Sequence, residues 1–416
     1  MSPIVTVILV ASNLGLIFLL MTAPLGLRTV RLGRVVAMDR QRLWQALWPL
    51  GSDAGWSGEI LSAEALDGDG MARVMLSWEG RDGQPIERIS HFEGVVEGSR
   101  FSMRVIEDTA LDASFWKDYR ETTELVSEGS GTRVTLSQTD RYRGIAFLVF
   151  RYFAMRRELG KLQHWARTGQ YRKGGWFEHP LSQVGFATLS ALILWPFFGL
   201  HLGGLALAAI LTSVVALHEL GHMAAFRLMG HRKARMIFIP LLGGIAIGGR
   251  PYDSRFEVAF VALMGAGFSA FLVPVAIAAS TFAGGEGHKV AAALLATLAG
   301  FLALFNIGNL VPVWKFDGGQ VLRQICPGPI LLALASFFLL SVFLGLGWRA
   351  GFSSNFLLAA GAVFSILSLL TMRSGVKPRH ELKPIRTVDR FVIAGALLAV
   401  FAIHGYGVLW ASAQLI

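Results

Sequence analysis

Two histidines and a glutamate stand at a spacing that suits metal chemistry, in the sequence HELGH that begins at His218. On a helix, positions four residues apart lie on one face, so His218 and His222 can reach the same metal ion. Neutral imidazole is a good zinc ligand, and a catalytic zinc site keeps one position for water. We therefore predict that His218 and His222 bind Zn²⁺ and that Glu219 is the catalytic base.

The motif lies within an apolar segment, at roughly residues 205–228. A chance match to H-E-x-x-H in a chain of this length has odds on the order of one in a hundred. Ionisable groups placed in hydrocarbon cost roughly several kcal/mol when they lack partners, so they usually mark a function. The structural alternative is a helix whose polar patch is satisfied by its neighbours. The apolar setting favours the metal site.

A tetrahedral zinc site needs a third protein ligand, and carboxylates are scarce in the apolar part of the chain. Asp317 stands out because Pro312 and the pair Gly318–Gly319 interrupt the helix around it, which frees backbone and lets a carboxylate turn inward. Taken alone, Asp317 fits an interfacial helix cap equally well. Together with the histidine motif, it is favoured as the third ligand.

The two motifs together resemble the site-2 protease family of intramembrane metallopeptidases, whose signatures are H-E-x-x-H and N-x-x-P-x(3)-L-D-G. The second reads NLVPVWKFDGG from Asn309 onward, with Phe316 where leucine is usual, and the resemblance covers about residues 180–325. It implies that Asp317 is the third zinc ligand. It also implies that Asn309 engages the substrate or polarises its carbonyl group.

Glycines follow the basic loop after the motif, in the segment PLLGG that ends at Gly243 and Gly244. Such glycines suit a re-entrant hairpin close to the site, and an ordinary glycine-rich loop fits them equally well. In the resembling family a β-element at this place offers an edge strand to the unwound substrate. Gly243 and Gly244 are therefore candidate substrate-binding residues.

The composition indicates a membrane protein. The 416 residues are 53% hydrophobic and 16% charged, with a mean hydropathy of +0.53, which soluble proteins seldom match. Of the 28 acidic residues, 20 fall between residues 28 and 175, so one soluble insert is expected there. The net charge of +10 comes from basic residues beside apolar segments, which argues against nucleic-acid binding.

Eight apolar runs approach the roughly 20 residues that a spanning helix needs. They lie at about 4–24, 182–200, 205–228, 257–282, 289–312, 329–347, 354–372 and 390–412. The basic stretches all fall on one side of the resulting topology: Arg28 to Arg42, Arg151 to Lys173, Arg227 to Arg235 and Arg373 to Arg390. The positive-inside rule then places both termini outside and the insert in the cytoplasm.

The insert has a different pattern. A short helix is predicted at Asp39 to Leu50, then five alternating segments within residues 71–138, then a long helix from about Gly144 to Trp165. The apolar positions of this last helix include Phe147, Phe150, Phe153, Leu159 and Leu162. The order resembles the START-like or polyketide-cyclase-like helix-grip domain, which encloses an apolar cavity. A small α+β domain used only for protein contacts is the alternative.

The predicted fold is thus a polytopic α-helical membrane protein with an inserted soluble α+β helix-grip domain. Its parts are a transmembrane anchor at 1–27, a cytoplasmic START-like domain at 28–175, an intramembrane metalloprotease core at 180–325 and C-terminal transmembrane helices at 326–416. Topology and family both suit a bacterial inner membrane. The expected partners are the lipid bilayer, membrane protein substrates with a transmembrane segment, and an apolar ligand or protein at the insert.

Two other functions remain open. A membrane di-iron oxygenase would draw on about eight clustered ligands, whereas the ten histidines here are dispersed. His231 lies near the motif but in a basic loop, where a solvated side chain is expected. A non-catalytic receptor that senses an apolar ligand is the second alternative, and the intact set of His218, Glu219, His222 and Asp317 argues against it.

Overall fold

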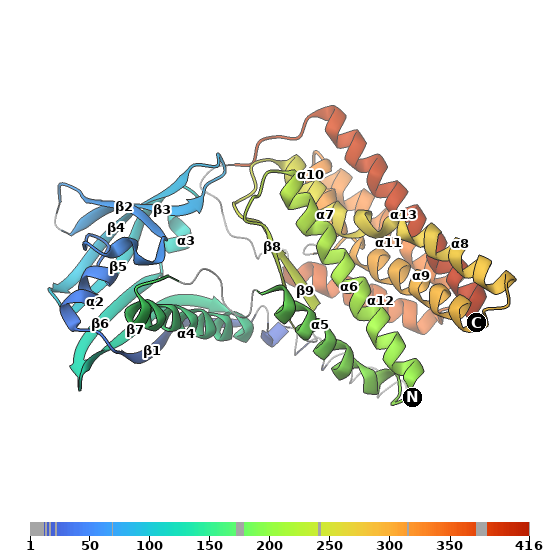
Figure 1. Cartoon of the computed structure of the whole chain (residues 1–416). Helices are drawn as coiled ribbons and strands as arrows, with labels where there is room; N and C mark the ends of the chain where they lie inside the picture. Colours follow the sequence, from blue (N-terminus) through green and yellow to red (C-terminus); the bar gives the residue numbers. More distant parts are fainter. Residues whose placement is uncertain are drawn as a thin grey trace. The chain divides into compact units, whose positions relative to one another are not determined.

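The structure is a computed structural model that describes residues 12, 15, 18–20, 23–68, 70–171, 179–239, 243–313, 316–371 and 381–415. The chain forms two compact units, Met1–Gly175 with Gly375–Glu381, and Trp176–Ser374 with Leu382–Ile416. Each unit has its own core and is described by itself. Figure 1 follows the chain through both units.

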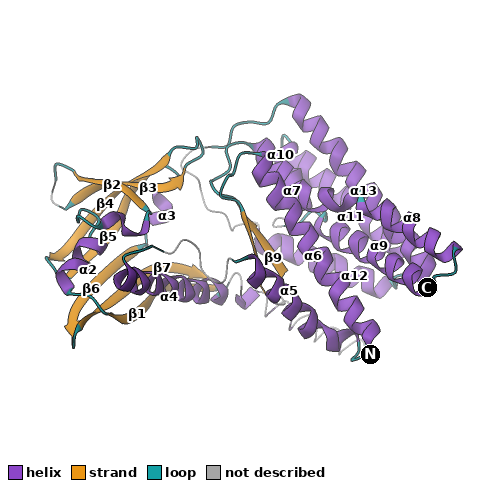
Figure 2. Cartoon of the chain, in the orientation of Figure 1, coloured by secondary structure: helices purple, strands orange, loops and turns teal. Residues whose placement is uncertain are grey.

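The first unit is built on one antiparallel sheet of seven strands, in the order β1-β7-β6-β5-β4-β3-β2 (Figure 2). The strands are β1 (Pro24–Val36), β2 (Ile60–Ala65), β3 (Met71–Glu79), β4 (Pro85–Val96), β5 (Arg100–Asp108), β6 (Arg120–Glu128) and β7 (Gly131–Arg143). The helices are α2 (Arg40–Leu47), α3 (Ala113–Trp116) and α4 (Ile145–Thr168). The predicted insert is therefore confirmed as an antiparallel sheet domain with a long final helix.

The core of this unit lies between the sheet and two of its helices. Alternate residues of the strands point inward, among them Val36, Phe101 and Val134. From α4, Leu159 and Leu162 meet them, each only 2% exposed. The first half of α4 differs, because Phe150 and Phe153 are 69% and 56% exposed. The apolar positions of α4 named from the sequence therefore do not all pack into the core.

Strand β1 was not among the predicted elements. Its residues Val30, Leu32 and Val36 alternate toward the core, and it pairs with β7 over twelve residues of that strand. Arg34 interrupts this alternation, and both Arg31 and Arg34 were predicted to lie in a basic loop beside a membrane span. Arg31 instead pairs with Glu124 of β6 at 2.8 Å.

The second unit is a bundle of helices. They are α5 (Pro180–Leu194), α6 (Leu202–Leu228), α7 (Arg255–Ala270), α8 (Leu272–Gly285), α9 (Lys289–Asn309), α10 (Asp317–Ile325), α11 (Pro329–Arg349), α12 (Ser354–Thr371) and α13 (Thr387–Leu415). Six described segments are long and apolar enough to cross a membrane: Pro180–Phe198, Leu202–Leu228, Arg255–Gly285, Lys289–Asn309, Pro329–Arg349 and Thr387–Gln414. The described apolar part of α12, Ser354–Ile366, is shorter. Most of the predicted first span lies outside the described residues.

Helix α6 packs against α5, α7 and α9, and α7 packs against α10. Small residues permit these close approaches, as in many membrane helix pairs. A Cβ atom on Gly221 of α6 would lie 2.2 Å from the carbonyl oxygen of Met264 in α7. The helix that carries the histidine motif is therefore held tightly to α7.

Between α6 and α7 the chain forms a hairpin of two antiparallel strands, β8 (Arg235–Ile239) and β9 (Gly243–Ile247). Met236 is opposite Ala246, and Phe238 is opposite Gly244. Strand β9 contacts α6. The residues between the two strands lie outside the described part of the chain.

Candidate metal centre

Helix α6 presents both histidines of the motif to one place. Their rings lie 4.7 Å apart, centroid to centroid, and are nearly perpendicular. Their Nε2 atoms are 3.1 Å apart. His218 is 3% exposed, so this pair lies well inside the bundle.

Asp317 joins them from another part of the chain, as the first residue of α10. Its Oδ2 lies 3.1 Å from Nε2 of His218 and 3.4 Å from Nε2 of His222. Glycine is required at the next position, since a Cβ atom on Gly318 would lie 1.9 Å from the carbonyl oxygen of Leu310. The Asp-Gly pair thus lets α10 begin directly against the end of α9 and places the carboxylate at the histidines.

The other ring nitrogens fix the tautomers of both histidines. Nδ1 of His218 lies 2.8 Å from Oδ1 of Asn306, and Nδ1 of His222 lies 2.8 Å from the carbonyl oxygen of Val261. Both partners are acceptors, so each Nδ1 carries the proton and donates it. In the neutral rings each Nε2 then offers a lone pair. With both rings neutral, two imidazole lone pairs and a carboxylate oxygen would converge on one point.

These three atoms fit a zinc ion. Ligand bonds of about 2.0–2.1 Å arranged as a tetrahedron separate neighbouring ligand atoms by about 3.3 Å. The three distances among His218, His222 and Asp317 run from 3.1 to 3.4 Å. A cation would relieve the repulsion among three buried acceptors, and Oδ2 of Asp317 has no hydrogen-bond partner in the described part of the chain. Three protein ligands leave a fourth position for water.

A buried chain of hydrogen bonds orients the first of these ligands. Nδ2 of Asn306 donates to Oγ of Ser269 at 3.0 Å and to the carbonyl oxygen of Leu302 at 2.8 Å. The hydroxyl of Ser269 in turn donates to the carbonyl oxygen of Ala266 at 3.2 Å. With its amide nitrogen so engaged, Asn306 must turn Oδ1 toward His218. Asn306 and Ser269 are both fully buried.

Gly265 of α7 lies against the rings from the other side. A Cβ atom there would approach Cε1 and Nε2 of His222 to 2.5 Å and Cε1 of His218 to 2.7 Å. Only a hydrogen atom fits at this position. Gly265 and Asn306 were not among the predicted site residues, although an asparagine amid apolar residues of a span is itself a signal of function.

Glu219 points from α6 toward the hairpin. Its Oε2 accepts a hydrogen bond of 2.9 Å from the backbone N–H of Ala246 in β9. A Cβ atom on Gly244 would lie 2.4 Å from Cγ of Glu219, so β9 passes directly over this side chain. Gly243 has a φ of +90°, which favours glycine, and it lies beside Val215 of α6.

The predicted site residues thus fall into three groups. The structure brings His218, His222 and Asp317 together, and it joins Glu219 to the strand that holds Gly243 and Gly244. Asn309 ends α9, and its Nδ2 donates to the carbonyl oxygen of Phe305 at 3.0 Å, a bond within its own helix. Of the two motif segments, residues 240–242 and 314–315 lie outside the described residues.

A second histidine–carboxylate cluster lies just beyond the C-terminal end of α6. His231 is fully buried, which contradicts the expectation of a solvated side chain. Its Nε2 is 2.6 Å from Oε1 of Glu257, and Nη2 of Arg250 lies 3.0 Å from the same oxygen. The N–H of Asp253 donates to Oε2 of Glu257 at 2.5 Å. This cluster could not be predicted from the sequence, because Glu257 follows His231 by 26 residues.

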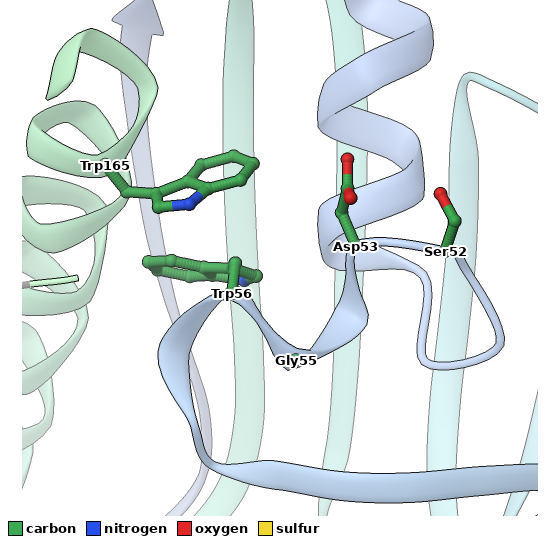
Figure 3. Close-up of a pocket in the computed structure, with 5 residues that line it drawn as sticks. All are labelled: Ser52, Asp53, Gly55, Trp56 and Trp165. Atoms are coloured by element: carbon green, nitrogen blue, oxygen red, sulfur yellow. The ribbon is translucent and has the colours of Figure 1, made fainter. Parts of the chain in front are cut away.

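The insert has a shallow depression of about 240 Å³ beside the end of α4 (Figure 3). Its lining residues are Ser52, Asp53, Gly55, Trp56 and Trp165, and the two tryptophan rings lie 5.5 Å apart.

Two groups of the insert, Glu59 and Tyr119, have raised pKa values. Burial raises the pKa of the Glu59 carboxyl group above its ordinary value, and the nearby Glu158 raises this pKa further. Burial also raises the pKa of Tyr119, whose hydroxyl donates to Glu121 at 2.7 Å. The apolar ligand predicted for the insert stays a prediction.

No family model matches the chain, and no curated protein matches it. Solved structures resemble about a third of it. They include DR_A0006 from Deinococcus radiodurans, at 15% identity over 34% of this chain and 99% of that one, with a TM-score of 0.25. A START superfamily protein from Mycobacterium smegmatis matches at 12% identity over 33% of this chain and 97% of that one, with a TM-score of 0.27.

The Aha1 dimer from Colwellia psychrerythraea also matches, at 11% identity over 35% of this chain and 99% of that one, with a TM-score of 0.28. Likeness at these TM-scores decides nothing about function. The description of the insert as a sheet that packs against a long final helix rests on its own strand order and contacts.

Proposed function

We propose that this chain is an intramembrane zinc metalloprotease that hydrolyses peptide bonds within or near transmembrane segments of other membrane proteins. The observation that carries the proposal is the convergence of three buried lone pairs, from His218, His222 and Asp317, within 3.1–3.4 Å of one another. The resemblance to the site-2 protease family agrees with this ligand set. Glu219 follows the first ligand directly and is the proposed catalytic base.

When bound there, zinc would lower the pKa of a water molecule and polarise the substrate carbonyl. The chain's own residues supply the rest of the chemistry. Glu219 takes the proton of the attacking water and passes it to the leaving amine. Asn306 holds His218 in the tautomer whose Nε2 is a ligand, and the Val261 carbonyl group does the same for His222.

Strand β9 is the proposed docking edge for an unwound substrate. The N–H of Ala246 points away from β8 and toward Glu219. Backbone groups two residues apart on a strand face the same side, so those of Gly244 also face away from β8. A substrate strand that pairs with this edge would take the Ala246 N–H and release the Glu219 carboxylate. Asn309 is proposed to bond the substrate backbone once it leaves the Phe305 carbonyl group.

The finer topology is part of the same proposal. Eight spans would place both termini outside and the insert in the cytoplasm of a bacterial cell, under the inner membrane. The insert would then act as a START-like sensor of a ligand or partner and regulate cleavage. Deletion of residues 40–170 tests this role, because unchanged cleavage and an unchanged ligand response would remove it.

The first experiment measures bound metal per purified chain. About one zinc is expected in the wild type, with loss in His222→Ala and in Asp317→Ala. His288→Ala is the matched control, since His288 is exposed and lies far along the chain from either motif. Zinc that survives Asp317→Ala would break the ligand set. Iron in place of zinc would favour the oxygenase.

A second experiment separates catalysis from metal binding. Glu219→Gln should retain zinc and lose about 10²- to 10⁴-fold in cleavage of a single-span substrate reconstituted in vesicles. A peptide hydroxamate, which binds zinc that has an open position, should raise the melting temperature of the wild type and of Glu219→Gln, and should leave Asp317→Ala unchanged. Cleavage by Glu219→Gln at the wild-type rate would show that another group is the base.

A further inference from the structure

The first half of α4 exposes a group of large apolar side chains, the aromatic face: Phe147, Val149, Phe150, Tyr152 and Phe153. Positions three and four apart are neighbours on a helix surface, so Phe147, Phe150 and Phe153 follow one another along one side. Nothing else among the described residues covers Phe150, which is 69% exposed. A contiguous patch of this kind usually marks an interaction site.

The aromatic face begins where the chain leaves its first apolar run. Residues 4–21 form that run, and Ala23 follows it. The carbonyl oxygen of Ala23 accepts a hydrogen bond of 2.8 Å from the N–H of Gly144, the residue before α4. In the proposed topology this run is a membrane anchor that ends at the bilayer surface, which would place Gly144 close to that surface as well. With a rise of about 1.5 Å per residue, Phe147 to Phe153 lie within about 14 Å of this point.

The charges around the face match an anionic surface. Arg143 precedes it and Arg156 follows it, and both side chains are exposed. Helices that lie in the headgroup region combine aromatic residues on one face with basic residues beside them, and they bury the apolar face about 5–10 Å deep. The second half of α4 shows the contrast, since Leu159 and Leu162 pack into the insert's own core.

We propose that the aromatic face of α4 docks the insert onto the lipid surface, with Phe150 and Phe153 in the headgroup–acyl boundary and Arg143 and Arg156 on anionic headgroups. This inference rests on the proposed membrane anchor at residues 1–27 and does not depend on the proposed peptidase. It gives the insert a fixed orientation on the bilayer, beyond what its covalent tethers impose.

The test places an environment-sensitive fluorophore on the full chain in vesicles. Cys326 is the only cysteine, so Cys326→Ser provides a background for single labels. Phe150→Cys is the probe position. Val126→Cys is the matched control, because Val126 is 59% exposed on β6 of the same unit. Nitroxide-labelled phosphatidylcholine in both leaflets serves as the quencher.

Lipid quenching is expected at position 150 and not at position 126, with more of it when phosphatidylglycerol is included. Adding Phe147→Ser and Phe153→Ser should bring the probe to the control level. Arg143→Glu with Arg156→Glu should abolish the phosphatidylglycerol effect. Equal quenching at both positions would overturn the proposal. A blue-shifted probe at position 150 that lipid does not quench would also overturn it, because a protein would then cover the face.

Discussion

The two buried histidine–carboxylate clusters of the helical unit differ in how their hydrogen-bond donors and acceptors balance. Around Glu257, the carboxylate oxygens accept hydrogen bonds from His231, Arg250 and the backbone N–H of Asp253. Around Asp317, Nδ1 of each neighbouring imidazole donates to a partner outside the cluster, Asn306 for His218 and the Val261 carbonyl oxygen for His222. The carboxylate of the first cluster is thus satisfied by hydrogen-bond donors, whereas the second cluster presents three acceptors to one point, which fits the proposed cation.

The hydrogen-bond partners of the histidines distinguish the two clusters better than burial or residue type does. Both clusters lie inside the bundle, and both combine histidine with a carboxylate. Only the partners of the second ring nitrogen separate them: Nδ1 of His218 has an acceptor, while Nδ1 of His231 has no partner among the described residues. This contrast supports the proposal that His218 and His222 bind a metal ion, while His231 pairs with Glu257.

Among these predictions, we expect the largest effect from loss of the Glu257 carboxylate. Glu257→Ala leaves the Arg250 guanidinium group and His231 buried beside each other, so we expect unfolding to become easier by about 3–5 kcal/mol. Zinc per folded chain should not change. Denaturant unfolding in detergent, with and without a chelator, measures both quantities.

Asp317→Ala is the reciprocal variant. It should lose zinc and its response to the chelator while it keeps most of the chelated wild type's stability, since no buried cation remains unpaired. If Glu257→Ala lost zinc from chains that are otherwise folded, the two clusters would be one functional unit and the comparison would fail.

A methyl group added to α7 would test the proposed metal site without changing the cluster around Glu257. Gly265→Ala forces the rings of His218 and His222 to move, because the new Cβ atom would lie within 2.5–2.7 Å of them. We expect a loss of about 1–3 kcal/mol in stability together with weaker zinc binding.

Gly267→Ala is the matched control on the same helix. Its Cβ atom would meet nothing closer than 3.6 Å, so the gain in helix propensity should leave it neutral or slightly stabilising. Zinc titration and thermal unfolding of both variants check this pair. Equal zinc affinity in Gly265→Ala and the wild type would mean that the rings have more room than the packing of α7 allows.

The site residues that lie close together in the sequence were easier to predict than those that lie far apart. The spacing of His218 and His222 is local to one helix, so periodicity suffices for it. Asp317 lies some 95 residues further on, and its role needed helix breakers and a second motif. Strand β1 was missed for a physical reason: Arg34 faces inward between Leu32 and Val36 and interrupts the apolar alternation.

The remaining features depend on tertiary contacts that no local pattern encodes. His231 meets its carboxylate only when the start of α7 packs against the end of α6. The aromatic and aliphatic positions of α4 have the same spacing and similar hydrophobicity, but Leu159 faces the sheet and Phe153 faces outward. Which of the two asparagines in α9 contacts His218 depends on the face that α9 turns toward α6.

Those two asparagines give the smallest and most specific prediction. Asn306→Ala removes the acceptor that holds His218 in its ligand tautomer, so zinc affinity should fall about 10- to 100-fold. Asn309→Ala, one turn further along the same helix, should leave zinc affinity unchanged because its side chain bonds within α9. Competition with chelators of graded strength measures both affinities.

The cleavage rate should distinguish a role of Asn309 in substrate binding from a role of Asn306 in zinc binding. If Asn309 binds the substrate backbone, Asn309→Ala should reduce the cleavage rate at full zinc occupancy. Asn306→Ala should recover much of its activity when zinc is raised, because its defect lies in holding the metal ligand. Asn306→Ala with wild-type zinc affinity would mean that the hydrogen bond to His218 does not set the tautomer, and the contrast with His231 would then lose its chemical basis.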